Sequence, residues 1–455
     1  MMIDISISEL VNNARLAQKE IENFTQEQID AVVKVVAKTI FDNAEALAKM
    51  AVEETGMGVY EHKVAKNTGK ARIIWNSLKS KKSVGVIEED LESGIIKVAK
   101  PMGVIGALTP CTNPIVTPMC NIMFALKGRN AIIIAPHPRA KKCASYTLEL
   151  INENLKKFNL PKNLIQTISE PSVELTNELM KSVDVIVATG GMGMVKAAYS
   201  SGKPSYGVGA GNVQCIIDRD VNFAEAAPKI ITGRAFDNGI ICSGEQMVIV
   251  HNDDYDNVVN ELVKNKAYFV NNEDDKNRLK KVLFDKDGVM NREAVGKSAA
   301  AIGKLAGIGV PDDVSVILVP VDARGKEDVL CKEKMCPVIG IVRYKSFEEA
   351  LDIAEANLEY EGKGHSVAIH SNNKDNLIKA GERLPVSRLL VNQICATMNG
   401  GSFVNGLAAT TTLGCGSWGN NSISENLDYK HFINITRIAS VIDGATQPPD
   451  DVIWG

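Results

Sequence analysis

At 455 residues the chain is too long for one hydrophobic core, so two or three domains are expected. Its 45% hydrophobic and 23% charged residues are typical of a globular protein that folds in water. The formal net charge of −4 argues against nucleic acid or an anionic membrane as a partner, and leaves small molecules as the expected ligands.

Targeting signals and metal patterns are both missing from the sequence. The N-terminus has no basic region followed by an apolar one, and no apolar run approaches the roughly 18 residues of a membrane helix. The nine cysteines form no CxxC pair and no zinc spacing, so no metal site is expected. An odd number of cysteines without a signal fits the reducing cytoplasm, where we expect the protein to be.

The first part of the chain is predicted to be helical. Apolar positions recur at helical spacing within residues 5–57, and a second helical stretch covers residues 59–79. Residues 84–89 and 94–99 then have the pattern of two strands joined by a turn, which predicts a β-hairpin.

From Gly103 onward, short apolar strands alternate with helices, which indicates parallel sheets covered on both faces. The first series of expected strands is 104–108, 131–135, 164–168 and 183–188, with helices at 115–126, 141–157 and 173–181. The second series is 214–217, 247–250, 314–319, 338–342, 367–369 and 389–392, with helices at 224–235, 256–266 and 347–356. A last strand is expected at 431–440.

The segment 237–246 is the most informative stretch of the chain. It places the thiol of Cys242 between an Asn-Gly turn and a strand that begins at Gln246. Such a turn presents a small nucleophile at the end of an element, where a carbonyl carbon can reach it. The alternative is a buried, inert cysteine, which is the common state of this residue type.

Two glycine runs lie between the predicted series of strands. Thr189, Gly190, Gly191 and Gly193 follow the strand 183–188 and open a helix at 194–199, an arrangement that suits a phosphate. The match to G-x-G-x-x-G is imperfect because Lys196 stands at the third glycine, and a tight turn without a ligand is the alternative. The second run, 207–212, permits close backbone approach to a ligand or serves as a linker.

Several segments together resemble a known family. The surroundings of Cys242, the turn at 189–193 and the stretch 333–338 appear in the order seen in the aldehyde dehydrogenase superfamily. The segments 109–114, 136–138 and 413–425 resemble its CoA-acylating branch. The resemblance covers nearly the whole chain, and within the branch the chain is most similar to CoA-dependent succinate semialdehyde dehydrogenases, also called succinyl-CoA reductases.

The resemblance implies an aldehyde dehydrogenase-like α/β fold with two Rossmann-like α/β domains and a small β oligomerisation element. Residues 1–82 and 101–215 would form the cofactor-binding domain, and residues 216–426 the catalytic domain. Residues 83–100 and 427–455 would form the oligomerisation element of a homodimer or homotetramer.

The implied reaction interconverts succinate semialdehyde, CoA and NAD(P)+ with succinyl-CoA and NAD(P)H. Cys242 would attack the aldehyde carbon, hydride would pass to the nicotinamide, and the CoA thiol would take the acyl group from the resulting thioester. Acetaldehyde or another short aldehyde is the alternative substrate. A phosphorylating reductase and a non-enzymatic scaffold are the alternatives from other classes.

Asn113 and His365 are the other expected catalytic residues. By resemblance, the Asn113 amide and the backbone N–H of the cysteine would stabilise the oxyanion, although Asn113 also suits a helix N-cap before Pro114. His365 could accept a proton from the CoA or Cys242 thiol, and a structural histidine is the alternative.

The second glycine run departs from the hydrolytic members of the superfamily. Gly207 stands where they carry the Glu that activates water, so the chain favours acyl transfer to a thiol. Glu245 is the alternative base.

The expected cofactor is NADP, or NAD, with CoA as co-substrate. By resemblance, Glu333 would hold the nicotinamide ribose, or else be a surface carboxylate. Thr109 and Gly209 join the 189–193 loop as expected cofactor-binding residues. By resemblance, His137 and Arg139 would lie near the adenine ribose; Lys141 and Lys142 follow them, and no carboxylate is nearby in the sequence. This basic group favours the 2′-phosphate of NADP, although a solvated helix face explains the same charges.

The expected substrate residues are Lys66, Lys70 and Ser243. Lys63, Lys66 and Lys70 share one helix face, and in the superfamily this helix borders the aldehyde tunnel. A cationic lining would suit the distal carboxylate of succinate semialdehyde, and Ser243 could add a hydroxyl donor. An exposed lysine face is the alternative.

Overall fold

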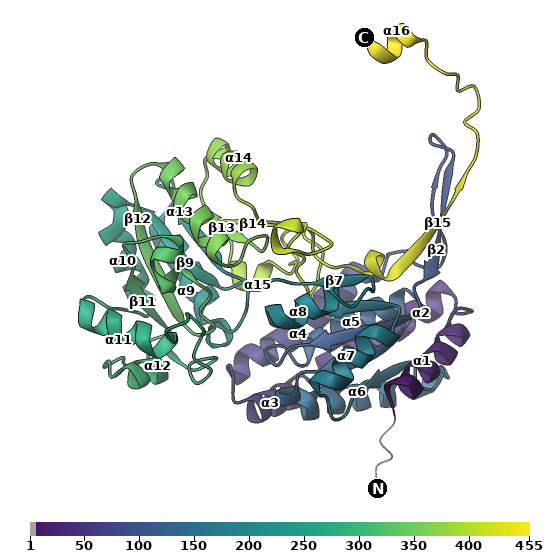
Figure 1. Ribbon diagram of the computed structural model, residues 1–455, viewed down its shortest axis with the longest axis horizontal. Coiled ribbons are helices and arrows are strands. Elements are labelled where there is room, and N and C mark those ends of the chain that lie inside the picture. The colour runs from purple at the N-terminus through teal and green to yellow at the C-terminus, as the bar shows by residue number, and fades with distance from the viewer. Residues whose placement is uncertain (1–5) are drawn as a thin grey trace.

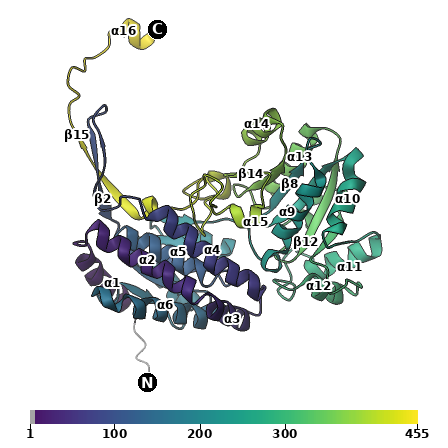
Figure 2. The same cartoon turned by 180° about the vertical axis from the view of Figure 1, so that it is seen from behind.

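Three β-sheets organise residues 6–455, the part of the chain that the computed structural model describes (Figures 1 and 2). A parallel five-stranded sheet has the order β5-β4-β3-β6-β7, and a parallel seven-stranded sheet has the order β10-β11-β12-β9-β8-β13-β14. An antiparallel sheet, β1-β2-β15, joins strands from distant parts of the chain. The predicted α/β fold with two parallel sheets and a small β element is confirmed.

Four N-terminal helices pack with the five-stranded sheet. They are α1 (Ile7–Ile21), α2 (Gln26–Asp42), α3 (Ala44–Thr55) and α4 (Tyr60–Leu78). Their starts follow from local chemistry, since Ser6 caps α1 and Thr25 forms a capping box with Gln28 at α2. Figure 2 shows α2 and α4 on one face of the sheet, and Figure 1 shows α7 and α8 on the other.

The five-stranded domain continues through alternating strands and helices. They are β3 (Val104–Thr109), α5 (Val116–Lys127), β4 (Ala131–Pro136), η1 (Pro138–Ala140), α6 (Lys141–Leu155), η2 (Lys156–Phe158), β5 (Ile165–Thr167), α7 (Val173–Ser182), β6 (Val185–Ala188), α8 (Met192–Tyr199) and β7 (Ser205–Gly207). Strands β3, β4 and β6 are buried along their whole length, which explains their continuous apolar sequences.

The seven-stranded domain follows. Its elements are β8 (Val213–Ile217), α9 (Phe223–Ala235), η3 (Phe236–Gly239), β9 (Glu245–His251), η4 (Asn252–Asp254), α10 (Tyr255–Lys264), β10 (Ala267–Phe269), α11 (Glu273–Leu283), α12 (Ala299–Ala306), β11 (Val316–Pro320), η5 (Gly325–Glu327), η6 (Val329–Cys331), β12 (Val338–Tyr344), α13 (Phe347–Tyr360), β13 (Val367–His370), α14 (Lys374–Arg383), β14 (Leu389–Val391) and α15 (Cys395–Met398). The predicted strands are confirmed, and α11, α12, α14 and β10 add to the predicted elements.

The small sheet forms an arm that projects from the five-stranded domain (Figure 1). It contains β1 (Gly85–Asp90), β2 (Ile95–Pro101) and β15 (Ile433–Ala439), preceded by η7 (Ser417–Gly419) and η8 (Tyr429–Phe432). The predicted hairpin and C-terminal strand are thus confirmed, and β2 pairs with both neighbours. A tail ending in α16 (Asp450–Trp454) extends beyond the arm.

Two local expectations need correction. Helix α5 begins at Val116 with Ile115 as its N-cap residue, so Asn113 is not the N-cap and Pro114 is not the first helical residue. The helix after the 189–193 loop begins at Met192, two residues earlier than predicted, which places Gly193 inside its first turn.

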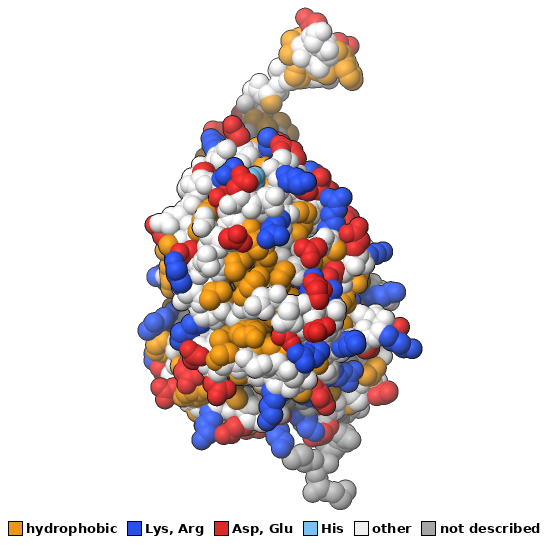
Figure 3. All heavy atoms as spheres, turned by 90° about the vertical axis from the view of Figure 1, so that its left-hand side faces the viewer, with side chains coloured by type: hydrophobic (Ala, Val, Ile, Leu, Met, Phe, Trp, Pro, Cys, Tyr) orange, Lys and Arg blue, Asp and Glu red, His pale blue; other side chains and the backbone are white. Residues whose placement is uncertain are grey.

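The described residues show neither a membrane-spanning helix nor, on the face in Figure 3, a broad basic surface. No helix within residues 6–455 combines the length and apolarity that crossing a membrane requires. Acidic and basic side chains are interspersed on the end of the molecule that Figure 3 turns to the viewer, so the described side chains of this face form no broad basic surface.

The second glycine run, at 207–212, packs against the segment of Cys242. A Cβ atom at Gly211 would overlap the carbonyl group of Cys242. Just before β8, the chain therefore lies in direct contact with the segment that leads into β9, and only a glycine fits there. The run is a structural contact between these segments and not a free linker.

We expect Gly211→Ala to destabilise the protein, because the added methyl group must displace the Cys242 backbone. Such overpacking costs about 1–3 kcal/mol, and thermal unfolding should show a midpoint lowered by several degrees. Gly381→Ala is the matched control, since the space at Gly381 in α14 is open. Equal unfolding midpoints for the two variants would contradict the close contact.

Candidate active site

A cavity of about 340 Å³ brings together five of the residues that the sequence singles out. Lys66 and Lys70 come from α4, Asn113 from the turn before α5, and Cys242 and Ser243 from the turn before β9. Residues from the stretch after β14 complete the wall. The cavity therefore lies where the two parallel-sheet domains meet.

Backbone conformation presents Cys242 to this cavity. Asp237 and Asn238 in η3 adopt left-handed conformations, with φ of 54° and 52°. The N–H of Gly244 then donates to the carbonyl of Ile241 at 3.0 Å, which closes a tight turn around the cysteine. The side chain of Cys242 is partly exposed and lines the cavity, so the thiol is not fully buried.

The thiol of Cys242 is protonated in the free protein at neutral pH. Burial, and to a smaller extent the neighbouring carboxyl group of Glu333, raises the pKa of Cys242 to about 12. The guanidinium of Arg388 acts in the opposite direction. Reactivity at neutral pH therefore requires a bound group that favours the thiolate.

The lysines of α4 are not an exposed face. Lys63 and Lys66 are only 4% and 9% exposed, and both ammonium groups contact the buried carboxylate of Asp237. Lys70 is different, because its Nζ donates to the carbonyls of Gly400 and Thr410, at 2.9 and 3.1 Å. Without a carboxylate partner, burial lowers the pKa of Lys70 to about 8.

Asn113 and Ser243 have defined partners at the cavity wall. The amide oxygen of Asn113 accepts a hydrogen bond from Lys66 Nζ at 2.6 Å. The hydroxyl of Ser243 donates to the carbonyl of Ala396 at 2.9 Å. The Ser243 hydrogen is thus directed to the backbone and not to a substrate, contrary to its expected role as a donor.

His365 lies outside the cavity lining and is completely buried. The hydroxyl oxygen of Ser366 accepts from Arg388 Nε at 3.2 Å and from Asn399 Nδ2 at 2.6 Å. Its own hydrogen is left for His365 Nδ1 at 3.0 Å, and these partners assign the ring proton to Nε2.

This proton assignment bears on the expected role of His365. Burial, with the charge of Arg388, lowers the pKa of His365 to about 3, so the ring is neutral. In this arrangement Nε2 is a donor without a partner among the described residues, and it does not have the free lone pair of the expected proton acceptor.

The expected cofactor residues gather at one edge of the five-stranded sheet. Thr109 ends β3, His137 follows β4 and Thr189 follows β6, and these three strands are neighbours. The carboxyl edge of such a sheet is where α/β domains bind dinucleotides. The residues there therefore fit a nicotinamide cofactor.

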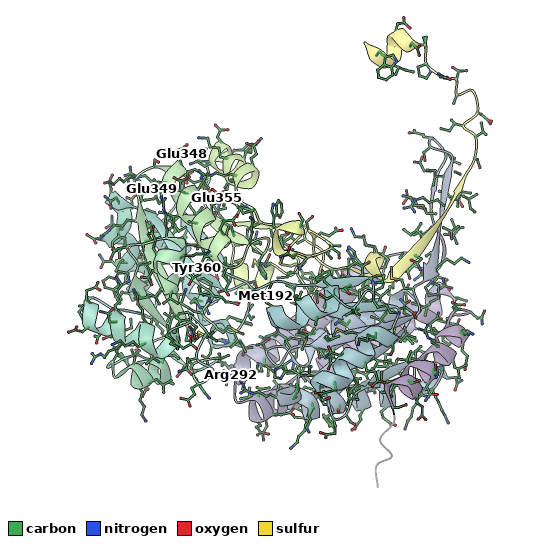
Figure 4. The ribbon with its side chains drawn as sticks, viewed as in Figure 1. Met192, Arg292, Glu348, Glu349, Glu355 and Tyr360 are labelled. Atoms are coloured by element: carbon green, nitrogen blue, oxygen red, sulfur yellow. The ribbon has the colours of Figure 1, made fainter. Side chains whose placement is uncertain are left out.

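The glycine loop at this edge leaves room for a phosphate. Gly191 is the N-cap of α8, and Cβ atoms at Gly191 and Gly193 would meet open space. Met192 is labelled in Figure 4, and its sulfur accepts a hydrogen bond from the N–H of Ala210 at 3.3 Å. The loop thus contacts the second glycine run beside Gly209.

Glu333 lies close to the same run. Burial and the neighbouring Glu361 raise the pKa of Glu333 to about 8, while the backbone N–H of Gly211 favours its charged form. Because Gly211 also contacts Cys242, the carboxylate and the thiol share one environment. Glu333 is partly exposed, so it is neither a fully solvated surface carboxylate nor a fully buried one.

Two carboxylates accompany the basic residues at 139–142, so the expectation that none lies nearby is wrong. Glu54 accepts hydrogen bonds from the backbone N–H groups of Lys142 and Cys143, at 2.8 and 2.7 Å. Lys141 pairs with Glu170. These carboxylates offset part of the basic charge, which weakens the argument from sequence for NADP over NAD. They come from α3 and from the loop after β5, so they are not neighbours of residues 139–142 in the sequence.

The cavity wall has no carboxylate that could activate a water molecule. The described residues that line it include no Asp and no Glu. The Oε1 atom of Glu245 accepts from the N–H of Cys395 at 2.8 Å inside the fold. A Cβ at Gly207 would already lie 2.7 Å from Val195 Cγ1 and 2.9 Å from Tyr199 Cε2. A carboxylate side chain has no room at that position.

Three buried residues near the thiol were missed by sequence reasoning. Asp237 was taken only as part of a turn, although it is the partner of both lysines. Arg388 and Cys415 both influence the charge state of Cys242. The one signal in the sequence was for Asp237, an acidic residue beside an Asn-Gly turn and five positions before Cys242. No metal-binding group of three or more His, Cys, Asp or Glu occurs in the described part of the chain.

The raised pKa predicts an unusual alkylation profile for Cys242. Labelling by iodoacetamide should keep rising between about pH 8 and 10, whereas an ordinary thiol levels off near its pKa of about 8.5. Mass spectrometry of the Cys242 peptide measures the rate, with glutathione as the reference thiol. A plateau near neutral pH would show that the thiolate is already stable in the free protein.

Comparisons with known proteins agree with this geometry. The model of the aldehyde dehydrogenase family matches residues 5–431. The acetylating succinate-semialdehyde dehydrogenase of Clostridium kluyveri is 54% identical over 455 residues, which is 100% of both chains. A sulfoacetaldehyde dehydrogenase of an Acholeplasma species is 44% identical over 98% of this chain and 93% of its own.

Among solved structures, a propionaldehyde dehydrogenase of Rhodopseudomonas palustris, with bound CoA and an acylated cysteine, superposes with a TM-score of 0.85. It is 29% identical, and the match covers 97% of this chain and 98% of that one. The family model and the full-length relatives place this chain in the aldehyde dehydrogenase family.

Proposed function

We propose that this protein is a CoA-acylating aldehyde dehydrogenase that interconverts succinate semialdehyde, CoA and NAD(P)+ with succinyl-CoA and NAD(P)H. The observation that carries the proposal is a cavity where Cys242 and Asn113 meet without any carboxylate to activate water. The full-length similarity to an acetylating succinate-semialdehyde dehydrogenase supports the substrate.

Cys242 and Asn113 would share the chemistry at the carbonyl group. The Cys242 sulfur would bond to the carbonyl carbon while its proton passes to solvent water and the carbonyl π electrons move to the oxygen. The carbonyl oxygen then carries negative charge, which the Asn113 amide and the Cys242 backbone N–H would stabilise; one such donor contributes about 3–4 kcal/mol. A bound nicotinamide cofactor supplies hydride acceptance or donation.

The acyl group would leave Cys242 on the CoA thiol. Without a positioned base, attack by water is slower by about 10²–10⁴-fold, so a thioester on Cys242 persists until a better nucleophile arrives. The acylated cysteine and bound CoA in the Rhodopseudomonas palustris relative support this order of events. Formation of the new thioester releases the Cys242 sulfur for the next turnover.

Lys70 is the residue best placed for a distal anion. Its ammonium group lines the cavity and has only backbone carbonyls as partners, so a substrate carboxylate would supply the missing negative charge. Sulfoacetaldehyde, named in the Acholeplasma relative, also carries a distal anion. Acetaldehyde and other short aldehydes, the remaining alternatives, lack one.

Thr109, the 189–193 loop, Gly209 and Glu333 are proposed to hold the cofactor, with His137 and Arg139 at its adenosine end. The site has both a basic group, Arg139, and an acidic group, Glu54. The first would suit the 2′-phosphate of NADP and the second the 2′-hydroxyl of NAD, so both cofactors are proposed. CoA is the proposed co-substrate.

The arm is proposed to join two or four copies of the chain. Val441 and Trp454 in its tail are 92% and 82% exposed, which is unusual for large apolar side chains unless a partner covers them. The division into cofactor-binding, catalytic and oligomerisation parts stays as predicted from sequence.

The activity assay follows oxidation of NADPH and of NADH with succinyl-CoA and with acetyl-CoA. We expect faster turnover of succinyl-CoA, and oxidation of the aldehyde only when CoA is present. Cys242→Ala should abolish both directions. Rapid formation of free acid without CoA, or full activity in Cys242→Ala, would refute the proposed function.

Substitution of Lys70 tests the recognition of the distal anion. Lys70→Met should raise the KM for succinate semialdehyde by about tenfold or more, and leave the KM for butyraldehyde nearly unchanged, because only the first substrate has a carboxylate.

The pH dependence gives a second measurement. Because the pKa of Lys70 is about 8, its charge is present below that pH and lost above it. The KM of the wild-type enzyme for succinate semialdehyde should therefore rise above pH 8, and that for butyraldehyde should not. An unchanged KM ratio in Lys70→Met would rule out this role for Lys70.

A further inference from the structure

The ammonium group of Lys66 is already occupied before any substrate binds. Its Nζ lies 2.6 Å from Asp237 Oδ2 and 2.6 Å from Asn113 Oδ1. The side chain is almost completely buried. A group held between a carboxylate and an amide oxygen is poorly suited to bind a second carboxylate, which is the role that the sequence suggested for Lys66.

The contact with Lys66 fixes the orientation of the Asn113 amide. An ammonium group can only donate hydrogen bonds, so the Asn113 atom that faces it must be the oxygen. The Nδ2 group, on the opposite side of Cγ from the oxygen, then points away from Lys66. No described residue accepts a hydrogen bond from this group, and Asn113 shares the cavity wall with Cys242.

The same contact makes Asn113 a better donor. A cation at the oxygen of an amide draws electron density from its nitrogen, and hydrogen bonds in such a chain strengthen one another. The side chain of Lys66 is almost completely buried, so this polarisation is screened less than it would be in water. Lys66 would thus act on the oxyanion through Asn113.

Asp237 holds Lys66 in place from the other domain. Its Oδ1 accepts from the N–H of Val59 at 2.9 Å, and its backbone N–H donates to His62 Nδ1 at 2.9 Å. A Cβ at Gly58 would overlap the same carboxylate. Four hydrogen bonds of Asp237, to Val59, His62, Lys63 and Lys66, thus tie α4 and the residue before it to the segment that carries Cys242.

We propose that Lys66, anchored by Asp237, is the positioning residue that orients and polarises Asn113 as the oxyanion donor. The proposal rests on the proposed function, because it gives Lys66 a part in the same reaction. It replaces the expected role of Lys66 in binding the substrate carboxylate, and leaves that role to Lys70.

The test is a double-mutant cycle between Lys66 and Asn113. Lys66→Met should lower kcat by about ten- to a hundredfold with both succinate semialdehyde and butyraldehyde, because every aldehyde forms the oxyanion. In an Asn113→Ala background, Lys66→Met should lower kcat by less than about threefold, since the group through which it acts is gone.

Lys63→Met is the matched control. Lys63 Nζ contacts the same Asp237 oxygen at 3.0 Å but has no contact with Asn113, so this variant also leaves Asp237 with a single lysine. Its kcat should stay within about threefold of wild type. Thermal unfolding of every variant separates a loss of stability from a loss of catalysis, and Lys66→Arg, which keeps a charged donor, should recover part of the kcat.

Each outcome decides the proposal. A defect of Lys66→Met confined to the KM of succinate semialdehyde would return Lys66 to substrate binding. Equal losses in the wild-type and Asn113→Ala backgrounds would show that Lys66 does not act through Asn113. If Lys66→Met does not fold, Asp237→Asn, which keeps the side-chain volume, replaces it in the same cycle. The CoA-dependent activity of the wild-type enzyme is measured in every assay. Its absence would contradict the proposed function, whereas the double-mutant cycle tests only the role of Lys66.

Discussion

The carboxylate of Asp237 is the contact on which the geometry of the site depends. It is buried at the junction of the two parallel-sheet domains, where it faces two ammonium groups of α4. Both kinds of charge have further hydrogen-bond partners: the N–H of Val59 donates to the carboxylate, and the Asn113 oxygen accepts from the Lys66 ammonium. Removing Asp237 would leave two buried cations uncompensated, whereas removing one lysine would leave a neutral pair. The cluster fixes the distance between the turn of Asn113 and the segment of Cys242.

Burial holds several site groups in their less charged forms. It shifts the pKa of Cys242 to about 12, of Glu333 to about 8 and of Lys70 to about 8. Each shift moves toward the neutral form, as expected where solvent is largely excluded. Ligand charges therefore affect these groups: a cation near Glu333 would favour its charged form, and an anion near Lys70 would keep the ammonium charged to higher pH. The free protein would be unreactive for the same reason, which protects the thiol until substrates are bound.

The sequence was sufficient for the parts that depend on local chemistry. The hairpin at β1 and β2, the buried strands β3 and β4, and the turn that presents Cys242 all follow from turn residues and apolar periodicity. It was insufficient where partners are far apart in the chain. Lys66 and Asp237 are separated by 171 positions, so their pairing is invisible to spacing arguments, and Lys66 was taken for a substrate residue. Glu54 was missed at the 139–142 basic group for the same reason, since it approaches from another helix.

The second glycine run explains why the site would prefer a thiol to water as the acyl acceptor. At one end of the run, Gly207 packs so closely on Val195 and Tyr199 that a larger residue would displace both. At the other end, Gly211 packs on the backbone of Cys242. Both glycines are therefore fixed by contacts within the protein. A carboxylate introduced at Gly207 would have to push α8 away, and α8 carries the glycine loop where a cofactor phosphate is proposed to bind. A carboxylate at position 207 and a bound cofactor would then need the same space. A single substitution at Gly207 is therefore not expected to give a hydrolytic enzyme.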